Sequence, residues 1–197
     1  WLTNIEDWPI ARQIAWGIPI PAKVCTECHH GMVDLDNSIT ACTKCGGTVE
    51  HEQDTFDTWF SSGQWPLCVT DYTGESNDFK TFYPTAVMET GKDILFFWVA
   101  RMVMLGLYRT GEVPFKKIYL HGMVRDKHGK KMSKSKGNVI APSEIQEKYG
   151  TDALRMGLMM NNVPGTDMNL DPDKVNAHKK FANKLWNITR FVLDNTA

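Results

Sequence analysis

The chain has 197 residues, of which 42% are hydrophobic, and its formal net charge at pH 7 is −1. A chain of this length and apolar content can form one or two folded domains, which excludes an intrinsically disordered protein. The nearly neutral charge provides no global field that would draw the protein to nucleic acid or to a membrane surface, so any contact with a polyanion must be local.

The first 24 residues are punctuated by prolines and are too irregular for a long helix. The chain opens at Trp1 without a methionine or a signal peptide, so we interpret it as a fragment of a longer protein. Its longest apolar run, residues 94–107, is interrupted by Arg101 and falls short of the ~20 residues that a membrane span requires. We therefore expect no membrane partner.

Residues 25–50 contain two C-x-x-C pairs, and Gly46-Gly47 follows the second pair. Each pair can place two thiolates on one side of a tight turn, and two such turns complete a tetrahedral sulfur site that suits structural zinc. Two disulfides or a redox dithiol are the alternatives, but nothing indicates an oxidising compartment, and a redox motif needs only one pair. The candidate zinc ligands are Cys25, Cys28, Cys42 and Cys45.

Three further residues bear on this site. His29 and His30 lie beside the first pair and could substitute as ligands, although four cysteines already complete the coordination shell. The remaining cysteine, Cys68, is interpreted as a small, partly buried hydrophobic residue.

The middle of the chain predicts a helix and a strand. After an aromatic and polar stretch at residues 54–65, residues 89–109 read as a turn with Gly91 and then a long helix. Apolar residues lie nearly all round this helix, which predicts that it is buried. Residues 118–124 are rich in β-branched and aromatic side chains, which predicts a buried strand that ends at Gly122.

The C-terminal part predicts helices. Residues 142–144 open a helix that Gly150 closes, and Thr151-Asp152 caps the next one. A final helix starts at about Asp173. Its apolar residues at helical spacing are Phe181, Leu185, Trp186, Ile188 and Val192. The alternation of strands and helices predicts an α/β fold, half of a parallel sheet with a helical segment appended.

The stretch KHGKKMSKSKGN, residues 127–138, concentrates lysines between two possible glycine hinges. A loop beyond the carboxyl end of a strand in an open α/β sheet lies where nucleotides bind. Lysine ammonium groups suit phosphate oxygens, so such a loop could close on a polyphosphate and stabilise charge that develops during displacement. A solvated basic turn is the alternative.

The order of residues in this loop is more specific than its composition. Residues 131–135 match, letter for letter, the KMSKS signature of the class I aminoacyl-tRNA synthetases. Four other segments resemble the valyl members of this family more closely than the isoleucyl or leucyl members. These segments are residues 57–66, 89–102, 121–126 and 183–191. The resemblance implies ATP-dependent activation of valine and its ligation to tRNA(Val) through an aminoacyl-adenylate.

The resemblance also implies residue roles. Lys134, assisted by Lys131, would stabilise the leaving pyrophosphate while the valine carboxylate attacks the α-phosphate of ATP. Glycine and aspartate before the helix would contact the ribose, and the end of the strand would lie near the adenosine. The implied ATP-binding residues are Gly91, Asp93, His121, Gly122, Met132, Ser133, Lys134 and Ser135.

The valine pocket is implied to be walled by Trp59, Ile94 and Trp98. The last two are four residues apart, so they would share one face of the predicted helix. Without the resemblance, both would be interpreted as plain core residues.

The implied fold is the second half of a Rossmann-like, parallel-sheet nucleotide-binding domain with an inserted zinc-knuckle lobe and a C-terminal α-helical segment. Residues 1–53 would lead into the catalytic domain and carry the knuckles at about 25–50. Residues 54–141 would form the Rossmann-like half with the KMSKS loop. Residues 142–172 would form a helical segment that contacts the tRNA stem, and residues 173–197 would begin the anticodon-binding bundle.

The implied cofactors and partners are structural Zn²⁺, ATP with Mg²⁺, valine and tRNA(Val), in a cytoplasmic and monomeric parent enzyme. The histidine-x-glycine-histidine signature of the family and its editing domain are absent from this sequence, so we expect the fragment to be inactive alone. An isoleucyl- or leucyl-type synthetase is one alternative. A zinc-ribbon nucleic-acid binding module is another, but it would require a basic excess, and 22 basic residues face 23 acidic ones.

Overall fold

The computed structural model describes residues 4–74, 76–160 and 162–196. The chain divides into two compact units, each described by itself. The first unit comprises Trp1–Thr85 and Phe96–Pro114, and the second comprises Ala86–Leu95 and Phe115–Ala197. Over the described residues, no helix combines the length and the apolar character needed to cross a membrane.

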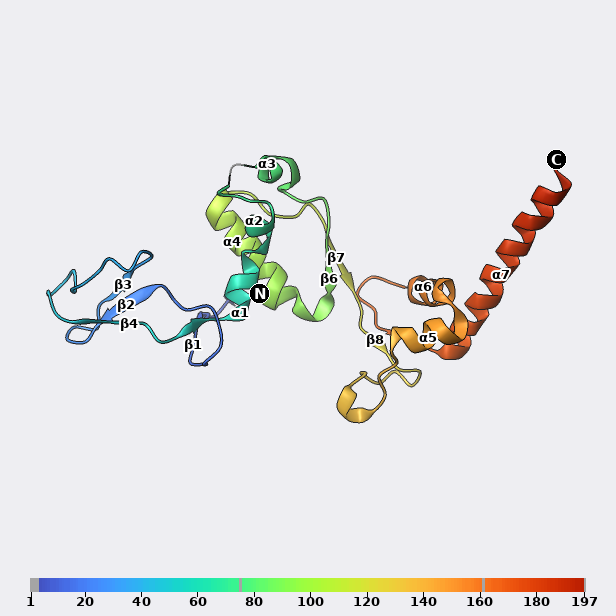
Figure 1. Cartoon of the computed structure of the whole chain (residues 1–197), viewed down its shortest axis with the longest axis horizontal. Helices are drawn as coiled ribbons and strands as arrows, with labels where there is room; N and C mark the ends of the chain where they lie inside the picture. Colours follow the sequence, from blue (N-terminus) through green and yellow to red (C-terminus); the bar gives the residue numbers. More distant parts are fainter. Residues whose placement is uncertain (1–3, 75, 161, 197) are drawn as a thin grey trace. The chain divides into compact units, whose positions relative to one another are not determined.

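The first unit combines small antiparallel sheets with short helices (Figure 1). Its elements are β1 (Ala11–Arg12), β2 (Ala22–Cys25), β3 (Gly31–Val33), β4 (Val49–His51), β5 (Thr55–Phe56), α1 (Thr58–Gly63), α2 (Trp65–Val69), α3 (Asp78–Phe82) and α4 (Ala100–Thr110).

A three-stranded sheet of order β3-β2-β4 forms the cysteine lobe, which we define as residues 22–51. Its core is thin, because the buried apolar cluster consists of Cys25, Met32 and Cys42. A buried ion pair adds to it, with Lys23 Nζ 3.0 Å from Asp34 Oδ2. A core of this size gives little hydrophobic stabilisation, so the lobe depends on its polar and thiol groups.

Helix α4 packs on α1 and α2 and differs from the helix predicted for this region. The α-helix begins only at Ala100, after a 3₁₀ turn at Lys92–Ile94 and a π-helical turn at Leu95–Val99. It buries Met102 and Gly106 but leaves Tyr108 89% exposed, so the prediction of burial all round is wrong. The reason is that, within the first unit, α1 and α2 cover one side of the helix.

The described residues of the second unit form parallel strand pairs and α-helices (Figure 1). Its elements are β6 (Met88–Gly91), β7 (Ile118–His121), β8 (Val124–Arg125), α5 (Pro142–Tyr149), α6 (Thr151–Met159), β9 (Met168–Asn169) and α7 (Pro172–Asn195).

Strands β6 and β7 lie side by side, with Met88 opposite Ile118 and Gly91 opposite His121. The strand predicted at 118–124 is present in part, as β7 and then β8, but the prediction that it is buried is wrong. Ile118 is 42% and Tyr119 is 39% exposed. In this unit β7 has β6 as its partner on one edge, and a two-stranded pair cannot enclose its own side chains.

The three helices share a core with the segments around β8 and β9. Its buried members are Ile145, Ala153, Leu154, Leu170 and Val175. Helix α6 packs on α7, and the side chain of Val175 would lie 3.1 Å from a Cβ at Gly157, which keeps the two helices close.

The boundaries of the C-terminal helices agree with the sequence except at one cap. Gly150 ends α5 with φ +91°, as predicted. The predicted cap at Thr151-Asp152 is wrong, because Gly150 is itself the N-cap of α6 and no side chain caps it. The predicted final helix is present as α7, and Asp171 caps it by accepting the N–H of Asp173.

Candidate functional site: a cysteine cluster and a clamped lysine loop

The four predicted cysteine ligands converge on one point. Their sulfur atoms all lie within 4.8 Å of one another. The Cys25 and Cys45 sulfurs are 3.5 Å apart, and those of Cys28 and Cys42 are 3.6 Å apart. Four sulfurs around a shared zinc ion would be separated by ~3.8 Å, because each lies ~2.3 Å from the metal in a tetrahedron. The cluster can therefore hold a metal ion.

The two C-x-x-C turns have the same backbone geometry. In the first turn the N–H of His29 donates to the carbonyl of Cys25, and in the second the N–H of Gly46 donates to that of Cys42. His29 and Gly46 both adopt a left-handed conformation, with φ of +55° and +76°. His29 thus occupies the position that glycine favours in the second turn. The described histidines are not part of the converging ligand group, which consists of cysteines alone.

The thiols influence one another's ionisation. Burial opposes ionisation of Cys42, but the backbone N–H groups of Cys45 and Lys44 hold its pKa at about 6. The N–H of Gly47 favours the Cys45 thiolate, yet the neighbouring thiols of Cys28 and Cys25 raise the pKa of Cys45 to about 12. Because one thiolate disfavours the next, four thiolates at this spacing require a cation.

The remaining cysteine differs from its prediction. Cys68 is exposed on α2, so its interpretation as a partly buried hydrophobic residue is wrong. All five cysteines are free thiols in this structure, so the alternative of two disulfides finds no support.

The lysine loop is closed by two polar side chains that its composition did not reveal. Buried Asp126 accepts the backbone N–H groups of His128 and Lys130, each at 2.9 Å. Its second oxygen accepts the side-chain amide of Asn138 at 2.8 Å. The Asn138 amide and these N–H groups hold the pKa of Asp126 below its usual range. Asp126 therefore fastens the start of the loop to its end.

Asn138 extends this clamp into the KMSKS signature. Its side-chain oxygen accepts the N–H of Ser133 at 2.9 Å, and its amide also donates to the carbonyl of Lys131 at 3.2 Å. The Ser133 and Ser135 hydroxyls are 2.8 Å apart. Asn138 thus fixes the backbone from which the signature side chains extend.

The clamp leaves the loop lysines free to act. Lys130, Lys131, Lys134 and Lys136 are exposed, and among the described residues none of them forms an ion pair. Residues 134–136 form a single 3₁₀ turn. Gly129 and Gly137 have φ of +76° and +65°, so both predicted hinge positions adopt backbone conformations that other residues disfavour.

The predicted ATP-binding residues outside the loop lie mainly at the carboxyl ends of β6 and β7. Gly91 and His121 are register partners, and a Cβ on Gly91 would lie 3.6 Å from the His121 ring. The His121 ring also contacts the Gly122 carbonyl at 2.8 Å and Glu89 at 3.2 Å. Asp93 is exposed in the 3₁₀ turn after β6. The carboxyl edge of parallel strands is where open α/β sheets bind ligands.

Gly122 has a packing reason for lacking a side chain. It is buried, and a Cβ at this position would lie 1.9 Å from the carbonyl oxygen of Thr166. The backbone around residues 165–167 therefore passes directly over the end of β7. Only glycine allows this close approach.

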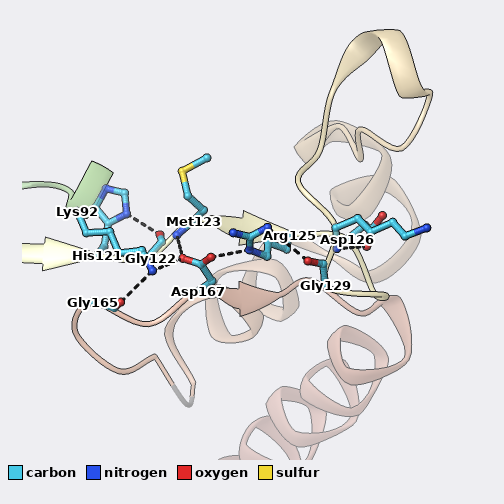
Figure 2. Close-up of polar contacts among 10 residues, drawn as sticks. Lys92, His121, Gly122, Met123, Arg125, Asp126, Gly129, Gly165 and Asp167 are labelled. Atoms are coloured by element: carbon cyan, nitrogen blue, oxygen red, sulfur yellow. Dashed lines mark hydrogen bonds and ion pairs between the residues drawn. The ribbon is translucent and has the colours of Figure 1, made fainter. Parts of the chain in front are cut away.

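One carboxylate ties this edge to the lysine loop (Figure 2). Asp167 accepts the Met123 N–H at 2.9 Å, pairs with Lys92 at 2.8 Å and receives the Arg125 Nε–H at 2.5 Å. Arg125 also reaches the carbonyl of Gly129 at the start of the loop, at 3.4 Å. Hydrogen bonds first from Lys92, then from the Met123 N–H and Arg125, hold the pKa of Asp167 well below its usual range. Neither its position nor this role was evident from the sequence.

The three residues predicted for the valine pocket lie on three different elements of secondary structure. Trp59 lies on α1, and Trp98 lies in the π-helical turn and donates its indole N–H to the carbonyl of Ser62 at 3.0 Å. Both are half-buried in the first unit. Ile94 ends the preceding 3₁₀ turn, in the second unit. The prediction that Ile94 and Trp98 share a face of one α-helix is wrong, because this stretch is not α-helical.

A model of the family described as "tRNA synthetases class I (I, L, M and V)" matches residues 1–171. The chain belongs to the class I tRNA synthetases. Because the chain belongs to this family, the alternative of an isolated zinc-ribbon module is rejected. The KMSKS sequence is accordingly interpreted as the signature loop of the family.

Curated relatives indicate which branch of the family the chain resembles. The chain is 50% identical over 192 residues to the valine--tRNA ligase of Desulfotalea psychrophila, which covers 97% of this chain and 22% of that protein. It is also 50% identical over 196 residues to the valine--tRNA ligase of Dehalococcoides mccartyi strain CBDB1, covering 99% of this chain and 22% of that protein. The chain thus spans about a fifth of the length of these relatives.

Solved structures share the fold. The chain superposes on LeuRS from Agrobacterium radiobacter K84, which was solved as a ternary complex with tRNA and LeuAMS. The TM-score is 0.79 and the sequence identity is 24%, and the match covers 96% of this chain and 29% of the LeuRS chain. Methionyl-tRNA synthetase of Mycobacterium tuberculosis, in complex with methionyl-adenylate, gives a TM-score of 0.64 and 24% identity over 88% of this chain and 29% of that one.

Proposed function

We propose that this chain is the KMSKS-bearing part of a valine–tRNA ligase, which activates valine with ATP and transfers it from valyl-adenylate to tRNA(Val). The observation that carries the proposal is the KMSKS sequence on a loop clamped by Asp126 and Asn138, with its lysines exposed. The names of the 50%-identical relatives support valine as the amino acid. Because the chain covers only 22% of those relatives, the activity belongs to the longer protein.

Lys134 is assigned the central role in activation, with Lys131 assisting. When the valine carboxylate attacks the α-phosphate of ATP, negative charge grows on the departing pyrophosphate. An ammonium group that meets this charge only in the transition state accelerates the step more than it strengthens ATP binding. The exposed lysines and the left-handed glycines at both ends of the loop support a segment that closes on the phosphates.

The rest of the ATP site is proposed at the edge formed by β6 and β7. Gly91 and Asp93 would lie at the ribose, and His121 and Gly122 beside the adenosine, with Gly122 shaping the edge through its close backbone contact. Mg²⁺ would accompany the ATP phosphates. Met132, Ser133 and Ser135 would contribute from the loop. The valine side chain would be enclosed by Trp59, Ile94 and Trp98.

We also propose roles for the thiol cluster and for the segments that surround the ATP site. We assign the thiol cluster to structural zinc, because four thiolates at tetrahedral spacing suit that ion. We assign β6 and β7 to a larger Rossmann-like sheet within residues 54–141, after the zinc-bearing segment 1–53. Residues 142–172 would contact the tRNA stem, and residues 173–197 would begin the anticodon-binding bundle. The parent enzyme is proposed to be monomeric and cytoplasmic.

The test is Lys134→Ala in the full-length enzyme, assayed by valine-dependent exchange of pyrophosphate into ATP. We expect the rate of exchange to fall about 10²-fold or more while the dissociation constant for valine changes little. The matched control is Lys127→Ala, which removes the same charge from an exposed position before the signature. Exchange at the wild-type rate in Lys134→Ala would remove this lysine from its assigned role.

The same assay with other amino acids tests the specificity. Wild-type enzyme should exchange pyrophosphate fastest with valine, and isoleucine should be rejected because a small pocket cannot hold its extra methylene. Faster exchange with isoleucine or leucine would show that the chain comes from one of the other branches of the family.

A further inference from the structure

We infer that Asp167 is a positioning residue for ATP activation, which holds the base of the lysine loop in register with the edge formed by β6 and β7. This inference rests on the proposed function. The Asp167 carboxylate contacts three segments of the second unit: the turn after β6 through Lys92, the junction of β7 and β8 through Met123, and the loop base through Arg125 (Figure 2).

The backbone holds Asp167 firmly in this position. The N–H of Gly165 donates to the Leu120 carbonyl at 2.8 Å, and the N–H of Met168 donates to the Met123 carbonyl at 3.0 Å. On the next residues, β9 pairs in parallel with β8. The segment that carries Asp167 is therefore bonded along β7 and β8 on both sides of the carboxylate, so the carboxylate is a fixed point to which longer side chains attach.

The two cations that Asp167 holds are flexible and partly exposed. The Lys92 and Arg125 side chains are 35% and 33% exposed, whereas that of Asp167 is 19% exposed. Lys92 lies between Gly91 and Asp93, which are assigned to the ribose. Arg125 precedes Asp126, which clamps the loop. Each cation thus connects Asp167 to a neighbour of the proposed ATP site.

The Asp167 carboxylate also forms ion pairs with two cations near the proposed polyphosphate site, which affects how these cations interact with ATP. Without it, Lys92 would keep its hydrogen bond to the Gly165 carbonyl and Arg125 its hydrogen bond to the Gly129 carbonyl, but neither would have a carboxylate partner. Both cations could then pair with the phosphates of bound ATP in its ground state. They would then compete with Lys134, and the base of the loop would lose its fixed position. Interactions that strengthen ground-state binding without following the transition state do not accelerate the reaction.

The experiment replaces Asp167 with asparagine in the full-length enzyme and measures valine-dependent pyrophosphate exchange. Asparagine keeps the shape and can still accept the Met123 N–H, but it loses the charge that holds both cations. We expect kcat to fall about tenfold or more, since small displacements of catalytic groups reduce rates on this scale. The KM for ATP should stay constant or decrease. Active-site titration by the burst of adenylate formation normalises the rates to folded enzyme.

The matched control is Asp171→Ala, which removes an aspartate four residues along the same segment. Asp171 caps α7 by accepting the N–H of Asp173, and among the described residues its side chain forms no hydrogen bond or ion pair with the loop or the strand edge. Its loss should therefore lower stability and leave kcat per active site unchanged. A second readout is tryptic cleavage at Lys130–Lys136 with and without ATP. In Asp167→Asn the loop should be cut faster, and protection by ATP should weaken.

The outcomes separate this inference from the proposed function. If the wild-type enzyme shows no valine-dependent exchange, the proposed function fails. If the wild type is active and Asp167→Asn retains its kcat per active site and its cleavage pattern, the positioning role is overturned. A raised KM for ATP with unchanged kcat would also overturn it, because that result would assign Asp167 to ground-state binding.

Discussion

The cysteine lobe and the lysine loop both contain turns with little regular structure, and in each of them polar side chains converge to fix the backbone. In the lobe the converging groups are four thiols, whose pKa values move apart, to about 6 for Cys42 and about 12 for Cys45. In the loop they are the Asp126 carboxylate and the Asn138 amide, which meet each other and backbone N–H groups.

The difference lies in what completes each arrangement. The thiol cluster consists of like groups, so the protein alone cannot satisfy it, and a bound cation is needed to make it rigid. The loop clamp pairs a carboxylate with donors that the chain itself supplies, so it forms and opens without a ligand. A segment locked by metal suits a structural lobe, whereas a segment held by a few hydrogen bonds suits a loop that closes on substrate.

The largest expected effect is therefore on the lobe when the metal is removed. We expect one zinc per chain, and structural zinc sites supply about 10 kcal/mol or more of folding free energy. Cys28→Ser should abolish stoichiometric zinc and expose the lobe amides to hydrogen exchange. Cys68→Ser is the control, because Cys68 is exposed and outside the cluster. A zinc-free protein whose lobe amides remain protected would show that thiols and packing suffice.

The same comparison explains how much could be predicted from sequence. The lobe was predictable because each ligand pair lies within one turn and cysteine at this spacing has few other uses. The KMSKS loop was recognisable from the order of its residues. Its supports were not, because Asp126 and Asn138 are 12 residues apart and Asp167 lies 42 residues from Arg125. Aspartate and asparagine are common in turns, so nothing in their local sequence indicates a distant partner.

Burial was the other feature that sequence predicted poorly. The apolar character of residues 94–107 and 118–124 indicates side chains that prefer an apolar environment, but it does not tell which elements cover them. In the structure α4 keeps one open face, and β7 has a partner on one edge. The π-helical turn at Leu95–Val99 has no sequence code of its own, so the change of helical geometry before α4 was also missed.

The second prediction concerns the loop clamp and should have an intermediate effect. Asn138→Ala removes the bonds to Asp126, to the Ser133 N–H and to the Lys131 carbonyl. We expect tryptic cleavage within the loop to accelerate about tenfold, the scale of one hydrogen bond to a charged group. Asn183→Ala, at an exposed position on α7, is the control. An unchanged cleavage rate would mean that the loop is held by something other than this clamp.

The smallest expected effect distinguishes the two turns of the cysteine lobe from each other. His29 and Gly46 hold equivalent positions with φ of +55° and +76°, but only glycine adopts this conformation without strain. His29→Gly should stabilise the zinc-bound lobe by about 0.5–1 kcal/mol, because relief of backbone strain exceeds the extra entropy that glycine has in the unfolded chain.

Gly46→His should destabilise the zinc-bound lobe by a similar amount or more. A Cβ at Gly46 meets nothing within 4 Å, so backbone strain is the dominant change. Hydrogen exchange at the amides of Cys25 and Cys42 measures both variants, and zinc content should stay at one per chain in each. A loss of zinc in His29→Gly would show instead that the imidazole contributes to the metal site, and the equivalence of the two turns would then hold for the backbone alone.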